Sequence, residues 1–194
     1  LSYSEMVKIA GGVPVIVYTQ KENNFMMTKQ QMMDAYTPKT KALVLTSPSN
    51  PTGMVSTIED LKIIAEFAIE KDIFVISDEI YEKLIYEQNK KHISIASLGQ
   101  EIYDRTIVIN GVSKSYAMTG WRIGFTATPL AIAKLVSALQ SHMTSNPNSI
   151  AQKATVAALN GSQQCVEDMC QEFKKRRDYI FEREEQIPYI HALK

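Results

Sequence analysis

Short apolar runs alternate with helical stretches along this chain, and that alternation limits the fold more than any other feature. Three of the runs predict buried strands, over residues 42–46, 73–77 and 106–110. Between the first two lies a predicted helix, residues 57–71, whose apolar residues recur at three- and four-residue steps. Strands alternating with helices of this length predict an α/β fold, with a mostly parallel sheet, helices on both faces and three layers.

The same patterns predict the remaining elements. Further helices are expected over residues 4–10, 28–36, 129–140, 149–159 and 166–185, and further strands over residues 13–18 and 123–127. Ser56 and Glu59 predict a capping box at the start of the helix 57–71. Because the chain starts at Leu1 in a loop-like stretch and ends just after a long helix, we expect it to be a piece of a longer polypeptide.

Composition excludes several classes of partner. Lysine and arginine number 21 and so do aspartate and glutamate, so no charge excess favours nucleic acid or a membrane surface. The basic run 174–177 is flanked by acids and is typical of a solvated helix face. The histidines have no spacing suited to a metal site, and Cys165 and Cys170 fall on different faces of a helix. Unpaired cysteines indicate a reducing cytoplasm.

Polar motifs follow each of the three predicted core strands. They are Asn50-Pro51-Thr52-Gly53, Asp78-Glu79-Ile80-Tyr81, and Ser113-Lys114 with Arg122. Because the carboxyl ends of parallel strands share one edge of a sheet, these motifs can meet in one crevice. A lone lysine in a connection is usually a surface residue. An amine, a carboxylate, a phenol, an amide and a guanidinium together suit a small molecule that carries an aldehyde, a basic ring nitrogen, a phenolic oxygen and a phosphate, which describes pyridoxal phosphate.

The segment 111–124 resembles the cofactor-attachment signature of the class I and II aminotransferases, in the aspartate aminotransferase family of fold-type I pyridoxal-phosphate enzymes. The loops 47–53 and 77–81 match that family in order and spacing. The resemblance implies that residues 1–165 form most of the family's large cofactor-binding domain, without its N-terminal part. Residues 166–194 would then lead into a small domain that lies outside this chain.

The resemblance assigns a role to each of five side chains. Lys114 would form the Schiff base with the cofactor aldehyde and, once released, move a proton between substrate and cofactor. Asp78 would pair with the protonated ring nitrogen, and Tyr81 would donate to the phenolic oxygen. Asn50 would contact the same oxygen and the substrate carboxylate, and Arg122 would hold the phosphate.

Some positions depart from the family's pattern or are assigned differently. Many members carry a serine that binds the phosphate where this chain has Gly111, and the aspartate-specific branch carries an arginine where this chain has Ser141. Trp121 is expected to pack beneath the site.

The resemblance implies transamination between an amino acid and a 2-oxo acid in a homodimer, with aspartate and 2-oxoglutarate as the first expectation. Aromatic or alanine transamination and β-elimination are alternatives with the same cofactor. From a different class, the chain could be a cofactor-binding or structural piece without turnover. Because the resemblance places part of the site outside the chain, we expect the 194 residues alone to be inactive.

Overall fold

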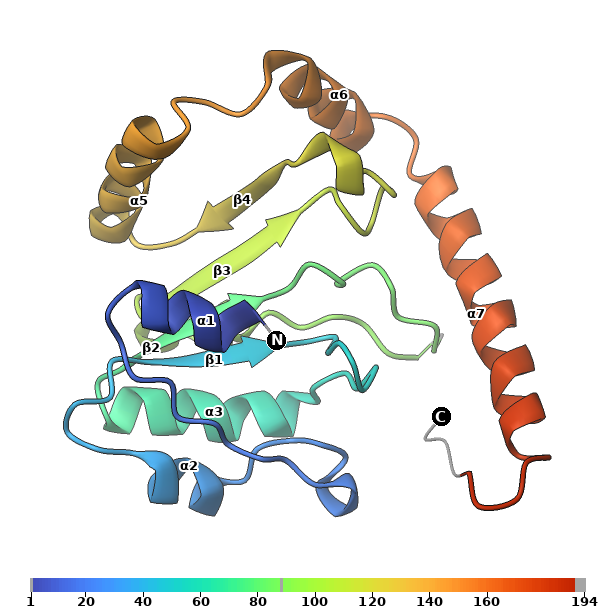
Figure 1. Ribbon diagram of the computed structural model, residues 1–194, viewed down its shortest axis with the longest axis horizontal. Helices are drawn as coiled ribbons and strands as arrows, with labels where there is room; N and C mark the ends of the chain where they lie inside the picture. The colour runs from blue at the N-terminus through green and yellow to red at the C-terminus, as the bar shows by residue number, and fades with distance from the viewer. Residues whose placement is uncertain (1, 88, 191–194) are drawn as a thin grey trace.

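A four-stranded sheet with the strand order β1-β2-β3-β4 forms the framework of the computed structural model, which describes residues 2–87 and 89–190 (Figure 1). The strands are β1 Ala42–Thr46, β2 Phe74–Asp78, β3 Thr106–Gly111 and β4 Gly124–Ala127. The first three are parallel, and β4 runs antiparallel to β3. The predicted mostly parallel α/β sheet is therefore confirmed, and the carboxyl ends of β1, β2 and β3 share one edge.

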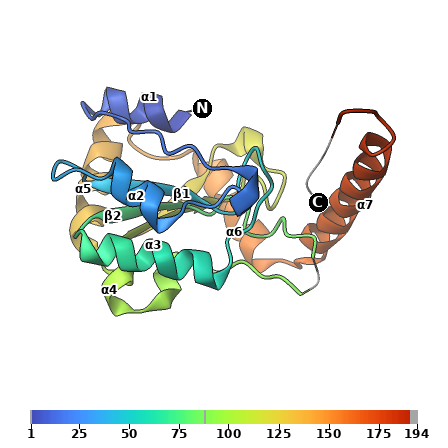
Figure 2. The same ribbon diagram turned by 90° about the horizontal axis from the view of Figure 1, so that it is seen from below.

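Helices lie on both faces of this sheet. They are α1 Ser2–Ile9, α2 Lys29–Ala35, α3 Ile58–Glu70, α4 Gln100–Tyr103, α5 Leu130–Met143, α6 Ser149–Asn160 and α7 Gln164–Glu184, with short 3₁₀ turns η1 Lys21–Asn23, η2 Ile95–Leu98 and η3 Thr119–Trp121. In Figure 2, α3 and α4 lie on one side of the sheet and α1 lies on the other. The last helix, α7, extends away from the strands.

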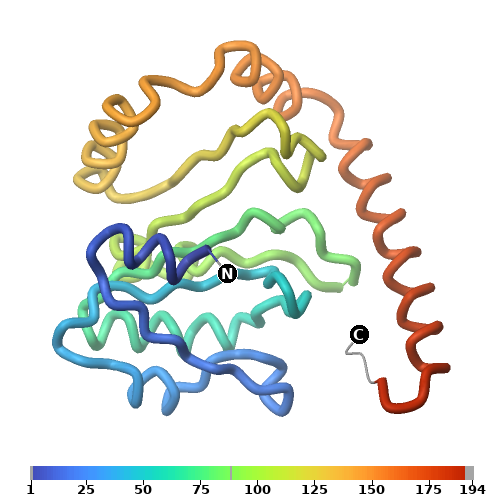
Figure 3. The backbone as a smooth tube through the Cα atoms, in the orientation of Figure 1, coloured from blue at the N-terminus to red at the C-terminus, as the bar shows by residue number. Residues whose placement is uncertain are grey.

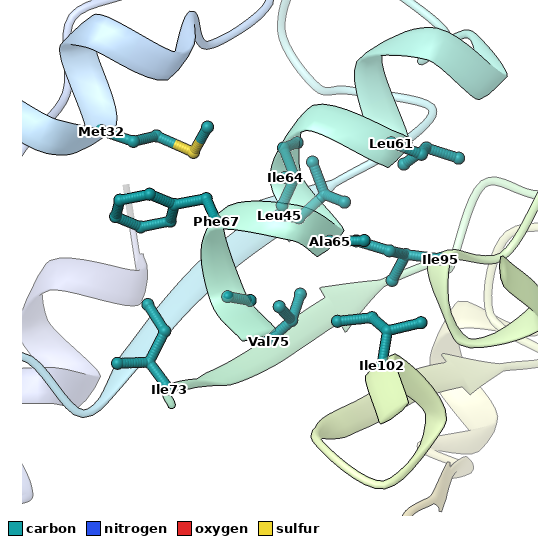
Figure 4. Packing of buried hydrophobic residues seen from close by; sticks show 11 residues of the cluster. Met32, Leu45, Leu61, Ile64, Ala65, Phe67, Ile73, Val75, Ile95 and Ile102 are labelled. Carbon is teal, nitrogen blue, oxygen red and sulfur yellow. The ribbon is translucent and has the colours of Figure 1, made fainter. Parts of the chain in front are cut away.

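The main core lies between α3 and the sheet (Figure 4). The inward face of α3 carries Leu61, Ile64, Ala65, Phe67 and Ala68, all buried. These side chains pack with buried residues of the strands, α2 and the η2–α4 region, namely Leu45, Ile73, Val75, Met32, Ile95 and Ile102. The three- and four-residue spacing in the sequence therefore predicted the correct buried face of this helix.

A smaller core cluster joins β3 and the segment after it to α6. Val112 and Ile123 pack with Ala151 of α6, and Tyr116 and Met118 lie against them. Gly111 sits where the chain leaves β3, and a Cβ atom there would lie 2.8 Å from the backbone oxygen of Ile123. The close approach of β3 and the start of β4 therefore leaves no room for a side chain at position 111.

The predicted strand over residues 13–18 is wrong. This segment is irregular and runs between α1 and η1 without joining the sheet (Figure 3). Its apolar residues are largely solvent-exposed, with Val13 at 86% and Tyr18 at 80%. An apolar run forms a strand only where a neighbouring strand can satisfy its backbone groups, and the pattern of a single segment does not report that neighbour.

The predicted capping box of α3 is displaced by one residue. Thr57 caps the helix, because its side chain accepts a hydrogen bond from the backbone nitrogen of Asp60 and the Asp60 carboxylate accepts one from that of Thr57. Ser56 is instead buried, and its backbone nitrogen donates to Oγ of Ser47 at 3.0 Å. Both positions carry hydroxyl side chains, so residue type alone did not distinguish them.

Large exposed apolar residues gather on α5, which buries none of its residues within the described part of the chain. They are Leu130, Leu135, Val136, Leu139 and Met143. Within residues 2–87 and 89–190, no helix combines the length and apolar character needed to cross a bilayer.

Candidate active site

Asp78 is the last residue of β2 and stands between the ends of the two neighbouring parallel strands. In the strand register it pairs with Thr46 of β1 and with Ile109 of β3. Its side chain is half-buried, and Oδ1 accepts a hydrogen bond from the backbone nitrogen of Ile80 at 3.1 Å. The turn after the strand therefore holds one carboxylate oxygen in place and leaves the other for a different partner.

That other partner is Tyr3, which the motifs in the sequence did not indicate as a site residue. Its hydroxyl donates to Oδ2 of Asp78 at 2.5 Å and accepts a hydrogen bond from Oγ1 of Thr46 at 3.0 Å. Burial, followed by the hydrogen bond to the Asp78 carboxylate, raises the pKa of Tyr3 to about 12. Tyr3 therefore stays protonated and donates to Asp78 at neutral pH. Because the two residues are 75 positions apart, no local pattern could predict this contact.

Three of the five predicted site residues meet around the ring of Tyr81. Nδ2 of Asn50 donates to the Tyr81 hydroxyl at 3.2 Å. Nζ of Lys114 lies 5.6 Å from the centroid of the same ring. Tyr81 follows β2, Asn50 follows β1 and Lys114 follows β3, so all three come from the shared carboxyl edge of the sheet. Of the predicted set, the structure therefore brings Asn50, Tyr81 and Lys114 together.

Lys114 itself is half-buried beside a buried neighbour, Ser115. The turn that holds it is closed by a hydrogen bond from the backbone nitrogen of Ala117 to the oxygen of Lys114, and Ala117 has a φ of +52°. The amine faces the aromatic ring of Tyr81, which attracts a cation. A constrained turn and a ring contact therefore hold the lysine near the phenol.

Arg122 lies apart from this group. Within the described residues, no hydrogen bond, ion pair or ring contact joins its side chain to Asn50, Asp78, Tyr81 or Lys114. It has a φ of +55°, its side chain is exposed, and Nη1 donates to the backbone oxygen of Thr119 at 2.9 Å. Arg122 also lines an open groove.

That groove has a volume of about 590 Å³ and lies between η3 and the connection from α5 to α6. Besides Arg122 it is lined by Trp121, Asn146 and Pro147. Trp121 is 45% exposed in this groove. This exposure does not fit the expectation that Trp121 packs beneath the site.

The donor set at the sheet edge fits a cofactor with an aromatic ring better than a metal ion. It consists of a phenol that pairs with an amide and lies near an amine, and of a carboxylate at the end of the neighbouring strand. In the part of the chain that the structure describes, no group of three or more histidine, cysteine, aspartate or glutamate side chains is placed to hold a metal.

Comparisons with known proteins agree with this architecture. The sequence model of a family described as aminotransferase class I and II matches residues 1–192. An aspartate aminotransferase from Geobacillus stearothermophilus is 50% identical over 194 residues, which are 100% of this chain and 49% of that protein. An aspartate aminotransferase from Bacillus subtilis (strain 168) is 48% identical over 194 residues, again 100% of this chain and 49% of that protein.

A solved structure shows the same likeness in three dimensions. The crystal structure of an aromatic aminotransferase from Pyrococcus horikoshii OT3 superposes with a TM-score of 0.92 at 41% identity, covering 96% of this chain and 50% of that one. The chain thus spans about half the length of the relatives that it matches.

Proposed function

Because the chain belongs to the class I and II aminotransferases, we propose that it is part of a longer protein that transfers an amino group between an amino acid and a 2-oxo acid. One observation carries this proposal. The Lys114 amine and the Asn50 amide both face Tyr81, at the sheet edge where Asp78 ends its strand. An amine, a phenol and a carboxylate so placed match the groups that pyridoxal phosphate needs.

Pyridoxal phosphate, when bound, supplies an aldehyde that combines with amines and a ring that withdraws electrons from the substrate Cα. The Lys114 amine would bind the aldehyde carbon. Once released, Nζ of Lys114 would carry a proton between the substrate and the cofactor. Asp78 would hold the proton on the ring nitrogen, and its bond from Tyr3 keeps the carboxylate oriented. Tyr81 would donate to the phenolic oxygen, with Asn50 fixing the direction of its hydroxyl.

We assign the phosphate to Arg122. Its Nη1 is used by the Thr119 carbonyl, and the other nitrogens can make a charge-assisted contact with a phosphate oxygen. Gly111 stands where many family members have a phosphate-binding serine, and here a side chain would collide with Ile123. That contact must then come from a backbone group or from residues outside this chain.

For the substrate we propose aspartate with 2-oxoglutarate, supported by the aspartate aminotransferases that share 50% and 48% identity with this chain. Aromatic transamination is the second candidate, since the solved relative from Pyrococcus horikoshii OT3 is an aromatic aminotransferase. Alanine transamination and β-elimination use the same cofactor and remain alternatives. Ser141 is exposed on α5, and this chain therefore offers no arginine at that position for a side-chain carboxylate.

We further propose the organisation of the longer protein. Residues 1–165 would belong to its large domain and residues 166–194 would lead into a small one. Support comes from α7, which extends away from the sheet and buries only Val166 among its described residues (Figure 1). A homodimer in the cytoplasm is proposed from the family resemblance, and Cys165 and Cys170 are both free thiols. We expect the 194-residue chain alone to have no turnover.

The test uses the full-length protein with Lys114→Ala and a matched exposed lysine, Lys62→Ala. We expect a visible absorbance band after addition of pyridoxal phosphate. Borohydride should fix the cofactor covalently to the peptide that contains Lys114, as read by mass spectrometry. The band and the label should survive in Lys62→Ala and disappear in Lys114→Ala. A label on another lysine would contradict the assignment. Separately, a panel of amino donors tested on the full-length protein would decide between aspartate and aromatic substrates.

A further inference from the structure

Glu79 follows Asp78 directly but turns to the opposite side of the strand end, where it is only 3% exposed. Three side chains donate hydrogen bonds to its carboxylate: Ser77 Oγ at 2.9 Å and Ser94 Oγ at 2.7 Å, both to Oε1, and His92 Nε2 at 2.8 Å to Oε2. None of the predicted site residues belongs to this group. We refer to Ser77, Glu79, His92 and Ser94 as the Glu79 cluster.

The Glu79 cluster holds a buried negative charge. Burial is the largest influence on the pKa of Glu79 and raises it, but the hydrogen bonds from His92, Ser94 and Ser77, with the charge of His92, together lower it below its ordinary value. The carboxylate is therefore ionised at neutral pH, and Nε2 of His92 carries the proton that it donates. A buried charge with three donors costs much more to move than a surface carboxylate.

The cluster closes a loop of the chain at its base. Glu79 and His92 are 13 positions apart, and the segment between them contains Tyr81. On the near side, the backbone nitrogen of Glu79 donates to the oxygen of Ile109 at 2.9 Å, and that of Glu82 donates to the oxygen of Glu79 at 2.9 Å. Tyr81 therefore lies inside a turn whose first residue is fixed both by β3 and by its own buried side chain.

The Tyr81 side chain, farther along this turn, is less restrained than Glu79. The Tyr81 side chain is half-buried, and its hydroxyl receives one hydrogen bond of 3.2 Å from the exposed Asn50. An exposed contact of this kind contributes little to holding a ring in one place. The backbone oxygen of Tyr81 also accepts a hydrogen bond from the backbone nitrogen of Leu84 at 2.8 Å, and Lys114 lies over the ring. These contacts involve half-buried or exposed groups, whereas Glu79 anchors the start of the turn with a buried side chain.

We infer that Glu79 is a positioning residue: its carboxylate, held by His92 and Ser94, fixes the turn that places the Tyr81 hydroxyl beside Asn50 and Lys114. The placement of Tyr81 follows from the contacts above. Only the consequence for pyridoxal phosphate rests on the proposed function. A cluster that served stability alone would change the unfolding temperature of the protein without a specific effect on Tyr81.

The experiment compares Glu79→Ala, Ser94→Ala and the control Glu82→Gln in the full-length protein. Glu82 lies in the same turn, and its carboxylate is 3.8 Å from Nζ of Lys83 and outside the Glu79 cluster. The readouts are the Kd for pyridoxal phosphate and the pH midpoint of the visible absorbance change of the bound cofactor. Loss of a well-placed phenol donor should weaken binding about 10-fold and raise the midpoint.

We expect Glu79→Ala to produce both changes, Ser94→Ala to produce smaller changes in the same direction, and Glu82→Gln to produce neither. The decisive arm repeats the set in a Tyr81→Phe background. If Glu79 acts through Tyr81, Glu79→Ala should change the pH midpoint in the Tyr81→Phe background by less than about a third of the change in the parent background. The reason is that Tyr81→Phe has already removed the hydroxyl through which Glu79 acts. Equal changes in both backgrounds would overturn the inference. Should Glu79→Ala fail to fold, Ser94→Ala decides by the same comparison.

A cofactor-free readout separates this inference from the proposed function. Crystal structures of the parent and of Glu79→Ala should be determined without cofactor, with Ser94→Ala as the substitute variant. Compared with the parent, the variant should show the Tyr81 hydroxyl displaced from Nδ2 of Asn50. An unchanged 3.2 Å contact in the variant would overturn the inference. If the parent binds no pyridoxal phosphate, the proposed function fails, and the crystal structures still decide the role of Glu79.

Discussion

The hydroxyl of Tyr3 in α1 donates a hydrogen bond of 2.5 Å to Oδ2 of Asp78 at the end of β2. Thr46, at the end of β1, donates to the same hydroxyl at 3.0 Å. A helix on one face of the sheet is thus tied to the carboxylate that we assign to the cofactor ring. This contact makes α1 part of the site, although its residues contain no recognisable catalytic motif.

Tyr3→Phe should weaken the binding of pyridoxal phosphate to the full-length protein by about 3- to 10-fold. The ring is kept, so packing changes little, but Oδ2 of Asp78 loses its donor and only Oδ1 is still held, by the backbone nitrogen of Ile80. Equilibrium titration with the cofactor measures the effect. Tyr18→Phe is the matched control, because Tyr18 is 80% exposed. Equal affinities for the Tyr3→Phe and Tyr18→Phe proteins would show that the bond to Asp78 does not orient the carboxylate for the cofactor.

The Tyr3 contact should also have a defined dependence on pH. Burial and the bond to Asp78 raise the pKa of Tyr3 from its ordinary value of 10.0 to about 12. Because the folded state holds the phenol proton more tightly than the unfolded state, the contact stabilises fully below about pH 10 and is lost as the pH rises toward 12.

The measurement is the difference in the free energy of unfolding between the parent and Tyr3→Phe, from denaturant titrations between about pH 8 and 11. Other titrating groups are common to both proteins and cancel in this difference. We expect a constant difference below about pH 10 and a shrinking one above it. A difference that grows with pH would contradict the raised pKa.

The sequence predicted the sheet edge well because its signals are local. The strand 42–46 has the bounds of β1, and one side chain from each of three motifs after the strands, Asn50, Tyr81 and Lys114, lies in the same group, whereas Arg122 does not. Tyr3 and the Glu79 cluster were missed because their partners are distant in the chain, 75 positions for Asp78 and 13 for His92. Trp121 was expected to be packed but is 45% exposed, because residue type alone does not determine burial at a single position.

Gly111→Ser, which introduces the serine expected from the family resemblance, should destabilise the protein by about 1–3 kcal/mol. A Cβ atom at this position would lie 2.8 Å from the backbone oxygen of Ile123 and 3.1 Å from Cα of Gly124, and neither atom can move without disturbing the β3–β4 pairing. Gly120→Ser is the control, because no atom lies within 4 Å of a Cβ built there. Thermal unfolding of the two variants should separate them, and similar unfolding temperatures would show that the backbone relaxes.

Arg122→Ala should weaken the binding of pyridoxal phosphate more than about 10-fold and leave the binding of pyridoxal, which lacks the phosphate, nearly unchanged. The side chain is exposed, and Nη1 donates to the Thr119 carbonyl three residues away, so its removal should disturb little else in the described part of the chain. Arg176→Ala is a suitable control, since Arg176 is exposed on α7 and pairs with Glu172. An equal loss of affinity for both ligands would remove Arg122 from the phosphate site.

The contrast between α3 and α5 yields a prediction about the longer protein. Leu61 of α3 is 1% exposed in the main core, and Leu61→Ala should cost about 2–5 kcal/mol in the free energy of unfolding. Leu135 of α5 is 71% exposed, and in the 194-residue chain Leu135→Ala should change stability by no more than about 0.5 kcal/mol.

The relatives are about twice as long as this chain, and a contiguous apolar face such as that of α5 is normally covered. In the full-length protein we therefore expect Leu135→Ala to cost about 1–3 kcal/mol, because the rest of the polypeptide would bury the side chain. Denaturant unfolding of both lengths with both substitutions gives the comparison. If Leu135→Ala stays neutral in the full-length protein, the outer face of α5 is exposed there too and its apolar residues need another explanation.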